Sequence, residues 1–489
     1  MADLGSRQPR WGFGEVLRLS MPAGMSMLGW TVTMFVDGVM LARLGPREFV
    51  AQSTASLVAF VPASFAVGVL GVVNTFVSQN LGAGKKRRCG QYSWAGMVLV
   101  GAFCLLVVPL AMLGGPLFAA IGHEPAVQGG EVLFFRYMML SLPVTLTVKV
   151  LEGFFYGIHR PVVVFVAAVT ANVINIVGDY GLIFGRLGMP NMGLEGAAVA
   201  TVTCWCAQVT ILMAAFLLPR FHLDFGTRHA RTVRLSQCGD IVRIGWPAGV
   251  TFMIDVFTWS IFTVVLIGRF GTAHLTAANA AVRYMQVSFM PAVGISIAIT
   301  AIVGRCIGSG QLDAARRRTH AAVIMAAGYM GACGLCFLVF RGPLIRVFVD
   351  VSPGLASAGM RASDILAIGG RMMICAAVFQ MFDAINIVFS GALRGAGDTR
   401  WPMVAFASLA AVLLVGGGAA MVHWLPQLES LGPYIAATVY IVALGLVMAW
   451  RFESGAWLRI DLLGRAGSRQ GAGEVQDRLQ ASTTTSDTL

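Results

Sequence analysis

Long apolar segments alternate with short polar ones along almost the whole chain. The apolar segments are close to 20 residues or longer, the length that a helix needs to cross a hydrocarbon core of about 30 Å. Alternation with a period of two is absent, and the segments are too long for the strands of a membrane barrel. The pattern predicts an all-α integral membrane protein with twelve transmembrane helices, at residues 16–42, 50–78, 93–115, 131–156, 161–184, 193–217, 241–268, 275–303, 319–341, 364–390, 402–422 and 433–450.

Composition agrees with this class. The 489 residues are 57% hydrophobic and 12% charged, whereas a soluble domain has about 25% charged residues. The first ten residues are polar, and the apolar run that follows is as long as a full span. We therefore expect this run to be retained rather than cleaved as a signal peptide.

Three short motifs recur about 226 residues apart. PAG at 22–24 returns at 247–249, RLG at 43–45 returns as RFG at 269–271, and GAG at 82–84 returns as GSG at 308–310. An internal repeat in a membrane protein is typical of transporters whose substrate site lies between the halves. Six spans return the chain to its starting side, so the repeat predicts two parallel six-helix bundles related by a pseudo-two-fold axis along the membrane normal.

The resulting organisation has five parts. We expect a cytoplasmic N-terminus at 1–15, a first bundle at 16–217, a polar cytoplasmic linker at 218–240, a second bundle at 241–450, and a disordered cytoplasmic tail at 451–489. Nine cysteines lie mostly within or beside spans, and we interpret them as packing residues rather than metal or redox sites.

The net charge of +12 is unevenly distributed between the two membrane faces. One set of loops holds sixteen Lys and Arg residues and the opposite set holds seven. The positive-inside rule therefore predicts that both termini are cytoplasmic. The basic excess is a topology signal rather than evidence for nucleic-acid binding, and we expect a plasma-membrane location, in a bacterium the inner membrane.

A few polar residues interrupt the apolar spans. Charged groups at mid-membrane are costly and are therefore rare and usually functional. Asn172, Asn175 and Asp179 share one face of the fifth span because they are spaced by one helical turn. The alternative is that each polar residue only locks neighbouring helices together. The candidate residues are Asp37, Asn172, Asn175, Asp179, Asp255 and Asp383.

Buried carboxylates of this kind favour antiport. Desolvation disfavours the charged form, so such a group can load and release a proton. Alternatively, carboxylate and amide oxygens hold Na⁺, either at Asp255 and Asp383 or at Asp37 and Asp179. A cationic substrate neutralises the same charge, so ion and substrate compete for one protein state. No further cofactor is expected.

Five segments in order resemble the multidrug and toxic compound extrusion (MATE) family of cation-coupled efflux transporters. They are VDGVMLARLG at 36–45, SQNLGAGKKRR at 78–88, NVINIVGDYGLIFG at 172–185, GLEGAAVAT at 193–201 and FQMFDAINIVFSGALRGAGDTRWPM at 379–403. The resemblance covers essentially residues 15–450. It implies a monomer with a twelve-helix, two-bundle fold, alternating access, and export of bulky, often cationic and aromatic compounds driven by H⁺ or Na⁺ entry.

The resemblance also implies roles for single residues. Asp37 and Asp383 match the family's aspartates in spans 1 and 10, and Asp255 falls where the family often has glutamate. A site of the proton-coupled branch is implied at Asn175, Asp179 and Thr201. Phe379 stands where some sodium-coupled members have a tyrosine, which removes one ligand of a sodium site.

Aromatic residues in the spans that should border the cavity are candidates for binding organic cations by stacking and cation–π contact. Each of them has the alternative of facing lipid or a neighbouring helix. The six candidates are Trp30, Phe35, Phe154, Phe155, Trp259 and Tyr284.

Three other classes of membrane protein fit the sequence less well than an efflux transporter. A lipid-linked oligosaccharide flippase of related architecture would favour cationic side chains in the cavity, whereas these spans carry acids. A membrane enzyme would need clustered catalytic residues, and neither an HExxH nor a GxSxG motif occurs. A repeated two-half plan favours alternating access over the fixed pore of a channel. The expected partners are small organic substrates and membrane lipids.

Overall fold

The computed structural model describes residues 12–121, 125–228, 233–351 and 362–462. Within these ranges twelve helices are long and apolar enough to cross a membrane, as predicted. The first half comprises α1 (Phe13–Leu44), α2 (Pro46–Gly71), α3 (Val73–Gly82), α4 (Lys86–Met112), α5 (Gly114–Ile121), α6 (Pro125–Gly157), α7 (Pro161–Phe184) and α8 (Gly193–Phe216).

The second half repeats this order. After the short α9 (Pro219–Phe225), it comprises α10 (Leu235–Ile261), η1 (Phe262–Ile267), η2 (Gly268–Phe270), α11 (Thr272–Gly308), α12 (Leu312–Val339), α13 (Arg341–Val351), α15 (Ala362–Ala396), α16 (Arg400–Leu409), η3 (Ala410–Gly416), α17 (Gly417–Trp424), η4 (Pro426–Leu428), α18 (Leu431–Glu453) and η5 (Ala456–Arg459). Thus α10 begins inside the predicted linker, six residues before the predicted span.

The predicted disordered tail begins too early. The chain remains folded to residue 462, because the Trp457 ring stacks on Phe452 with 5.1 Å between ring centroids and is 1% exposed. The indole N–H of Trp457 also donates to the backbone carbonyl of Phe452. Residues 463–489 of the predicted tail lie outside the described residues.

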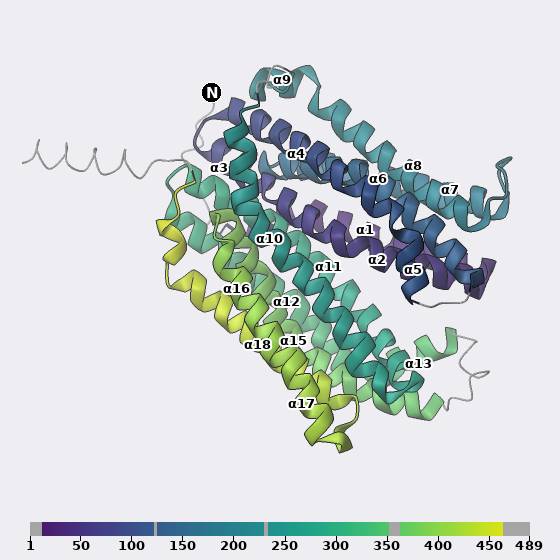
Figure 1. Cartoon of the computed structure of the whole chain (residues 1–489). Coiled ribbons are helices and arrows are strands. Elements are labelled where there is room, and N and C mark those ends of the chain that lie inside the picture. Colours follow the sequence, from purple (N-terminus) through teal and green to yellow (C-terminus); the bar gives the residue numbers. More distant parts are fainter. Residues whose placement is uncertain (1–11, 122–124, 229–232, 352–361, 463–489) are drawn as a thin grey trace, which may run out of the picture.

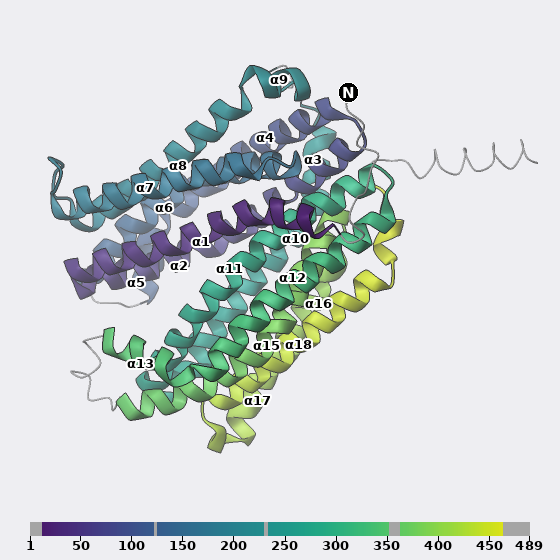
Figure 2. The ribbon, with the colours of Figure 1, turned by 180° about the vertical axis from the view of Figure 1, so that it is seen from behind.

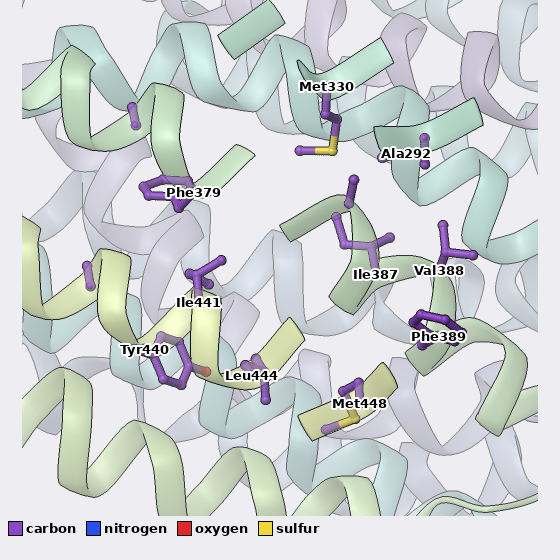
Figure 3. Close-up of a cluster of buried hydrophobic side chains, with 14 of the residues drawn as sticks. Ala292, Met330, Phe379, Ile387, Val388, Phe389, Tyr440, Ile441, Leu444 and Met448 are labelled. Carbon is purple, nitrogen blue, oxygen red and sulfur yellow. The ribbon is translucent and has the colours of Figure 1, made fainter. Parts of the chain in front are cut away.

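The helices form two lobes, which we call the N-lobe (α1–α8) and the C-lobe (α10–α18) (Figure 1). Each lobe has its own apolar core, and Figure 3 shows part of the C-lobe core around Phe379 and Tyr440. Both views show the lobes meeting near the start of α1 and α3 and diverging toward α5 and α13 (Figures 1 and 2). We call these the joined end and the open end.

Glycine contacts confirm the pseudo-two-fold relation between the lobes. Gly82 lies against the backbone of Arg305, and Gly308 lies against the backbone of Gln79. With the offset of 226 residues, these two contacts are the same contact seen from each half. Gly304 lies against Ser78, its own equivalent, and therefore marks the axis. A self-complementary contact of this kind is what two-fold symmetry requires.

Polar side chains also join the lobes at the joined end. Asn74, Thr75 and Gln79 of the N-lobe donate to backbone carbonyls of Ile297, Arg394 and Gly395, at 3.3, 2.9 and 2.9 Å. These bonds link α3 to α11 and α15 of the C-lobe and satisfy the buried side-chain donors of α3.

An ion-pair cluster lies at the same end. Glu15, in the first turn of α1, pairs with Arg305 of α11 and with Arg318 of α12, the latter at 2.6 Å. The carboxylate of one lobe is therefore held between two guanidinium groups of the other.

Candidate functional site

The N-lobe brings two of the predicted carboxylates together. The carboxyl groups of Asp37 of α1 and Asp179 of α7 lie close enough to interact with each other. Asp179 is fully buried, and Asn175, one turn earlier on α7, is 1% exposed. The helices pack against each other, so the polar face predicted for the fifth span points at α1.

The buried polar atoms of this group have no donors or acceptors among the described residues. Both carboxylate oxygens of Asp179, one oxygen of Asp37 and both amide atoms of Asn175 are buried without a hydrogen-bond partner. Two ionised carboxylates cannot donate to each other and repel, whereas a proton on one of them supplies the missing hydrogen bond. The same oxygens suit a small hard cation.

Asn172 and Thr201 extend the site along the lobe. The Asn172 amide lies so close to Gly29 of α1 that a Cβ there would approach its nitrogen to 2.8 Å. The Thr201 hydroxyl of α8 donates to the Ala197 carbonyl at 2.9 Å, so its oxygen can act toward another group only as an acceptor. Cys204, one turn beyond Thr201, lies in the electrostatic field of both aspartates.

A second group of acids forms in the C-lobe. Asp255 of α10 and Asp383 of α15 interact electrostatically. Trp259 and Asn386 lie near Asp255 and Asp383, respectively. Tyr440 of α18 interacts with both acids. The seven predicted site residues therefore fall into two groups, one in each lobe, rather than one.

Phe379 stands where the resemblance expects a hydroxyl, and it is 2% exposed in the C-lobe core. Tyr440 supplies a phenol to this region from another helix, and Figure 3 shows both rings in the core of the lobe. Loss of one hydroxyl at position 379 thus does not leave the two acids without a nearby phenol.

Two of the aromatic candidates follow the alternative of packing against neighbouring helices. Phe154 and Phe155 are fully buried, and Phe154 packs edge-to-face on Phe216 at 4.8 Å and on Phe225 at 5.6 Å. They belong to the N-lobe core because their helix, α6, is central in that lobe, a fact that periodicity alone does not give.

The other aromatic candidates differ among themselves. Tyr284 donates to the Leu344 carbonyl at 2.8 Å and so links α11 to α13. Trp259 is half-buried beside Asp255. Trp30 and Phe35 are 40% and 60% exposed, and Trp30 shares a face of α1 with Asp37, seven residues later.

Sequence reasoning missed three polar groups. Cys204 and Tyr440 look like ordinary core residues in sequence and acquire meaning only through their neighbours. Lys149 and Glu152 form an ion pair of 3.2 Å within α6, and Gln208 of α8 donates to Glu152 at 3.4 Å. Opposite charges three residues apart inside an apolar span were a detectable signal.

Comparisons with known proteins agree on one family. The MatE family model matches residues 22–181 and 247–417, so both halves match. The multidrug resistance protein NorM of Burkholderia vietnamiensis is 28% identical over 449 residues, covering 90% of this chain and 93% of that protein. A probable multidrug resistance protein NorM of Pseudomonas putida is 26% identical, covering 93% and 96%.

Solved structures share the fold. A transporter structure from Pyrococcus furiosus superposes with a TM-score of 0.82 at 19% identity, covering 92% of this chain and 97% of that one. A mutant of the Vibrio cholerae MATE transporter VcmN superposes with a TM-score of 0.81 at 17% identity, covering 92% and 98%.

Proposed function

Because the chain belongs to the MatE family, the multidrug and toxic compound extrusion transporters, we propose that it exports small organic, cationic and aromatic compounds in exchange for H⁺ or Na⁺. The observation that carries the proposal is the Asp37–Asp179 pair, two carboxyl groups inside one lobe whose buried oxygens lack donors. The NorM relatives are named as multidrug resistance proteins, which supports small organic substrates.

The arrangement of the lobes supports alternating access. They are joined at one end by close helix contacts and by the Glu15 cluster, and they diverge at the other (Figure 2). The joined end lies beside the basic cluster at 85–88, which the positive-inside rule places in the cytoplasm. The structure is then an outward-open state, and rocking of one lobe against the other produces the inward-open state.

Ion and substrate compete in the proposed cycle. In the outward-open state a proton binds between Asp37 and Asp179 and removes one negative charge, or Na⁺ binds at Asp255 and Asp383. Neutralisation lowers the affinity of the lobe for an organic cation, which leaves outward. In the inward-open state the ion dissociates to the cytoplasm and a new cation binds.

The experiment uses purified protein in liposomes loaded with a fluorescent organic cation. A pH gradient and a Na⁺ gradient are imposed separately while dye movement is followed. Movement with the pH gradient alone would assign proton antiport and favour the Asp37–Asp179 site. Movement with Na⁺ alone would assign sodium antiport and favour the C-lobe acids. No movement with either gradient would overturn the proposal and favour the flippase.

Three variants sharpen this assay. Asp37→Asn and Asp383→Asn are expected to abolish gradient-driven efflux while protein levels in the membrane stay normal. Asp313→Asn is the matched control, because Asp313 is an exposed residue at the start of α12. Normal efflux by both Asp37→Asn and Asp383→Asn would show that neither lobe couples through these acids.

A further inference from the structure

A polar face runs along α6 inside the N-lobe. Thr145, Lys149, Glu152 and Tyr156 are spaced four, three and four residues apart and so share one side of the helix. Leu140, which is 61% exposed, lies nine residues before Lys149, or two and a half turns. Lys149 therefore points away from the exposed side of α6.

The opposing helix presents a matching stripe. Thr201, Cys204 and Gln208 of α8 are spaced three and four residues apart, and α6 packs against α8. Cys204 interacts electrostatically with Asp37 and Asp179, and Gln208 donates to Glu152 at 3.4 Å. Glu152 lies five residues from the end of α6 at Gly157, whereas Asp179 lies eighteen residues from the start of α7 at Pro161. The Lys149–Glu152 pair is therefore on the order of 20 Å nearer the joined end than Asp179.

Burial differs between the two partners of the pair. The Glu152 side chain is 10% exposed, whereas the Lys149 side chain is 29% exposed. The buried Tyr156 hydroxyl, one turn beyond Glu152, has no hydrogen-bond partner within the described ranges. An apolar pair of similar volume would hold α6 in place at lower cost, so structure alone does not account for two charges here.

We propose that this pair selects the charge of the substrate. Glu152 binds the positive group of an organic cation, and Lys149 is a tethered counter-ion that occupies Glu152 whenever no cation is bound. Glu152 is then always paired with a positive group, either Lys149 or the substrate. The Lys149–Glu152 pair is therefore neutral without an additional proton. This inference rests on the proposed function for its substrate class.

Equilibrium binding to the purified full chain tests the inference without any gradient. Tetraphenylphosphonium is a permanent aromatic cation, and triphenylphosphine oxide is its neutral counterpart. Glu152→Gln leaves Lys149 unneutralised and is expected to weaken tetraphenylphosphonium binding by on the order of tenfold. Lys149→Met removes the competitor and is expected to strengthen it by a similar factor. Neither change should alter binding of the neutral compound.

Two controls keep the outcome interpretable. The double variant Lys149→Met with Glu152→Gln holds no charge and should fold with wild-type thermal stability and intermediate affinity. Lys86→Met removes the same charge from an exposed pair, Lys86–Asp224 at 3.4 Å, and should leave both affinities unchanged.

Three results would overturn the inference. The first is an equal effect of each substitution on the binding of both compounds, which indicates a structural role. The second is unchanged affinity for tetraphenylphosphonium in both single variants, and the third is no binding of tetraphenylphosphonium to the wild-type protein. Gradient-driven transport by the wild type is measured separately. Its failure would reject the proposed function, whereas the binding results alone decide the role of Lys149 and Glu152.

Discussion

The ion-pair cluster at the joined end should set the balance between outward-open and inward-open states. Glu15 joins α1 to α11 and α12 through Arg305 and Arg318. If alternating access separates the lobes at this end, all of these contacts break in the inward-open state. Glu15→Gln then removes the carboxylate between two guanidinium groups and destabilises only the outward-open state.

Burial gives the size of the effect. Breaking a fully buried ion pair costs about 3–5 kcal/mol, and breaking an exposed one costs about 0–1 kcal/mol. Here the side chains of Glu15, Arg305 and Arg318 are 26%, 34% and 8% exposed, which is between these limits. We take about 2 kcal/mol, a factor of about 30 in the ratio of the two states.

Spin-label distances at the open end measure this ratio. Leu113 at the end of α4 and Trp424 at the end of α17 are both exposed, and cysteines there, in a background without the nine native cysteines, report how far the lobes diverge. Glu15→Gln should move the distance distribution toward shorter values. Glu453→Gln is the control, because Glu453 pairs with His320 within the C-lobe at exposed positions. Identical distributions for wild type and Glu15→Gln would refute the reasoning.

Two further predictions concern stability. A Cβ at Gly68 would lie 2.6 Å from a backbone atom of α10, whereas a Cβ at Gly71 would have open space. Gly68→Ala should therefore lower the free energy of unfolding by about 1–3 kcal/mol, and Gly71→Ala should not. Equal melting temperatures of the two variants would contradict this prediction. Burial and the nearby Arg305 guanidinium lower the pKa of His159, in the loop between α6 and α7, to about 4. As the pH falls, the histidine of the unfolded chain takes up a proton first, near pH 6.5. The neutral His159 therefore contributes its full stability to the fold above pH 6.5, and this contribution is lost as the pH falls toward 4. The loss in the free energy of unfolding is about 2 kcal/mol by pH 5. His159→Asn, which tolerates the positive φ of 60° at this position, should lose less stability than wild type between pH 7 and pH 5 in thermal unfolding; equal losses would contradict the assignment.

The spans and the repeat were predictable because each depends on local composition or on matching letters. The thickness of the hydrocarbon core requires about 20 apolar residues per helix. The offset of 226 residues in the sequence aligns Gly82 with Gly308, and their contacts in the structure match. The face of the fifth span was predictable for a similar reason, since Asn175 and Asp179 obey helical spacing. Membrane composition alone did not reveal where folding ends, because the anchor of residues 454–462 is one buried ring, Trp457.

Helix neighbours were the information that the sequence lacked. Phe154 has the same apolar character as a cavity-lining aromatic, and only the position of α6 at the centre of the N-lobe buries it. Tyr440 is likewise one tyrosine in an apolar helix until α18 places it beside Asp255 and Asp383. Periodicity determines which residues share a face, whereas the identity of the helix opposite that face depends on packing between segments far apart in sequence.

The symmetry of the backbone and the asymmetry of the polar residues have different consequences. The matched contacts of Gly82 and Gly308 relate the backbones of the two lobes around a point at Ser78 and Gly304. The polar groups do not follow that symmetry. The N-lobe contains Asp37, Asp179 and an internal Lys–Glu pair on α6, whereas the C-lobe contains two acids beside a phenol. A proton needs only one basic oxygen, whereas a metal cation needs several oxygen ligands. Separate pH and Na⁺ gradients with single-lobe variants are therefore the experiment that distinguishes which ion each lobe binds.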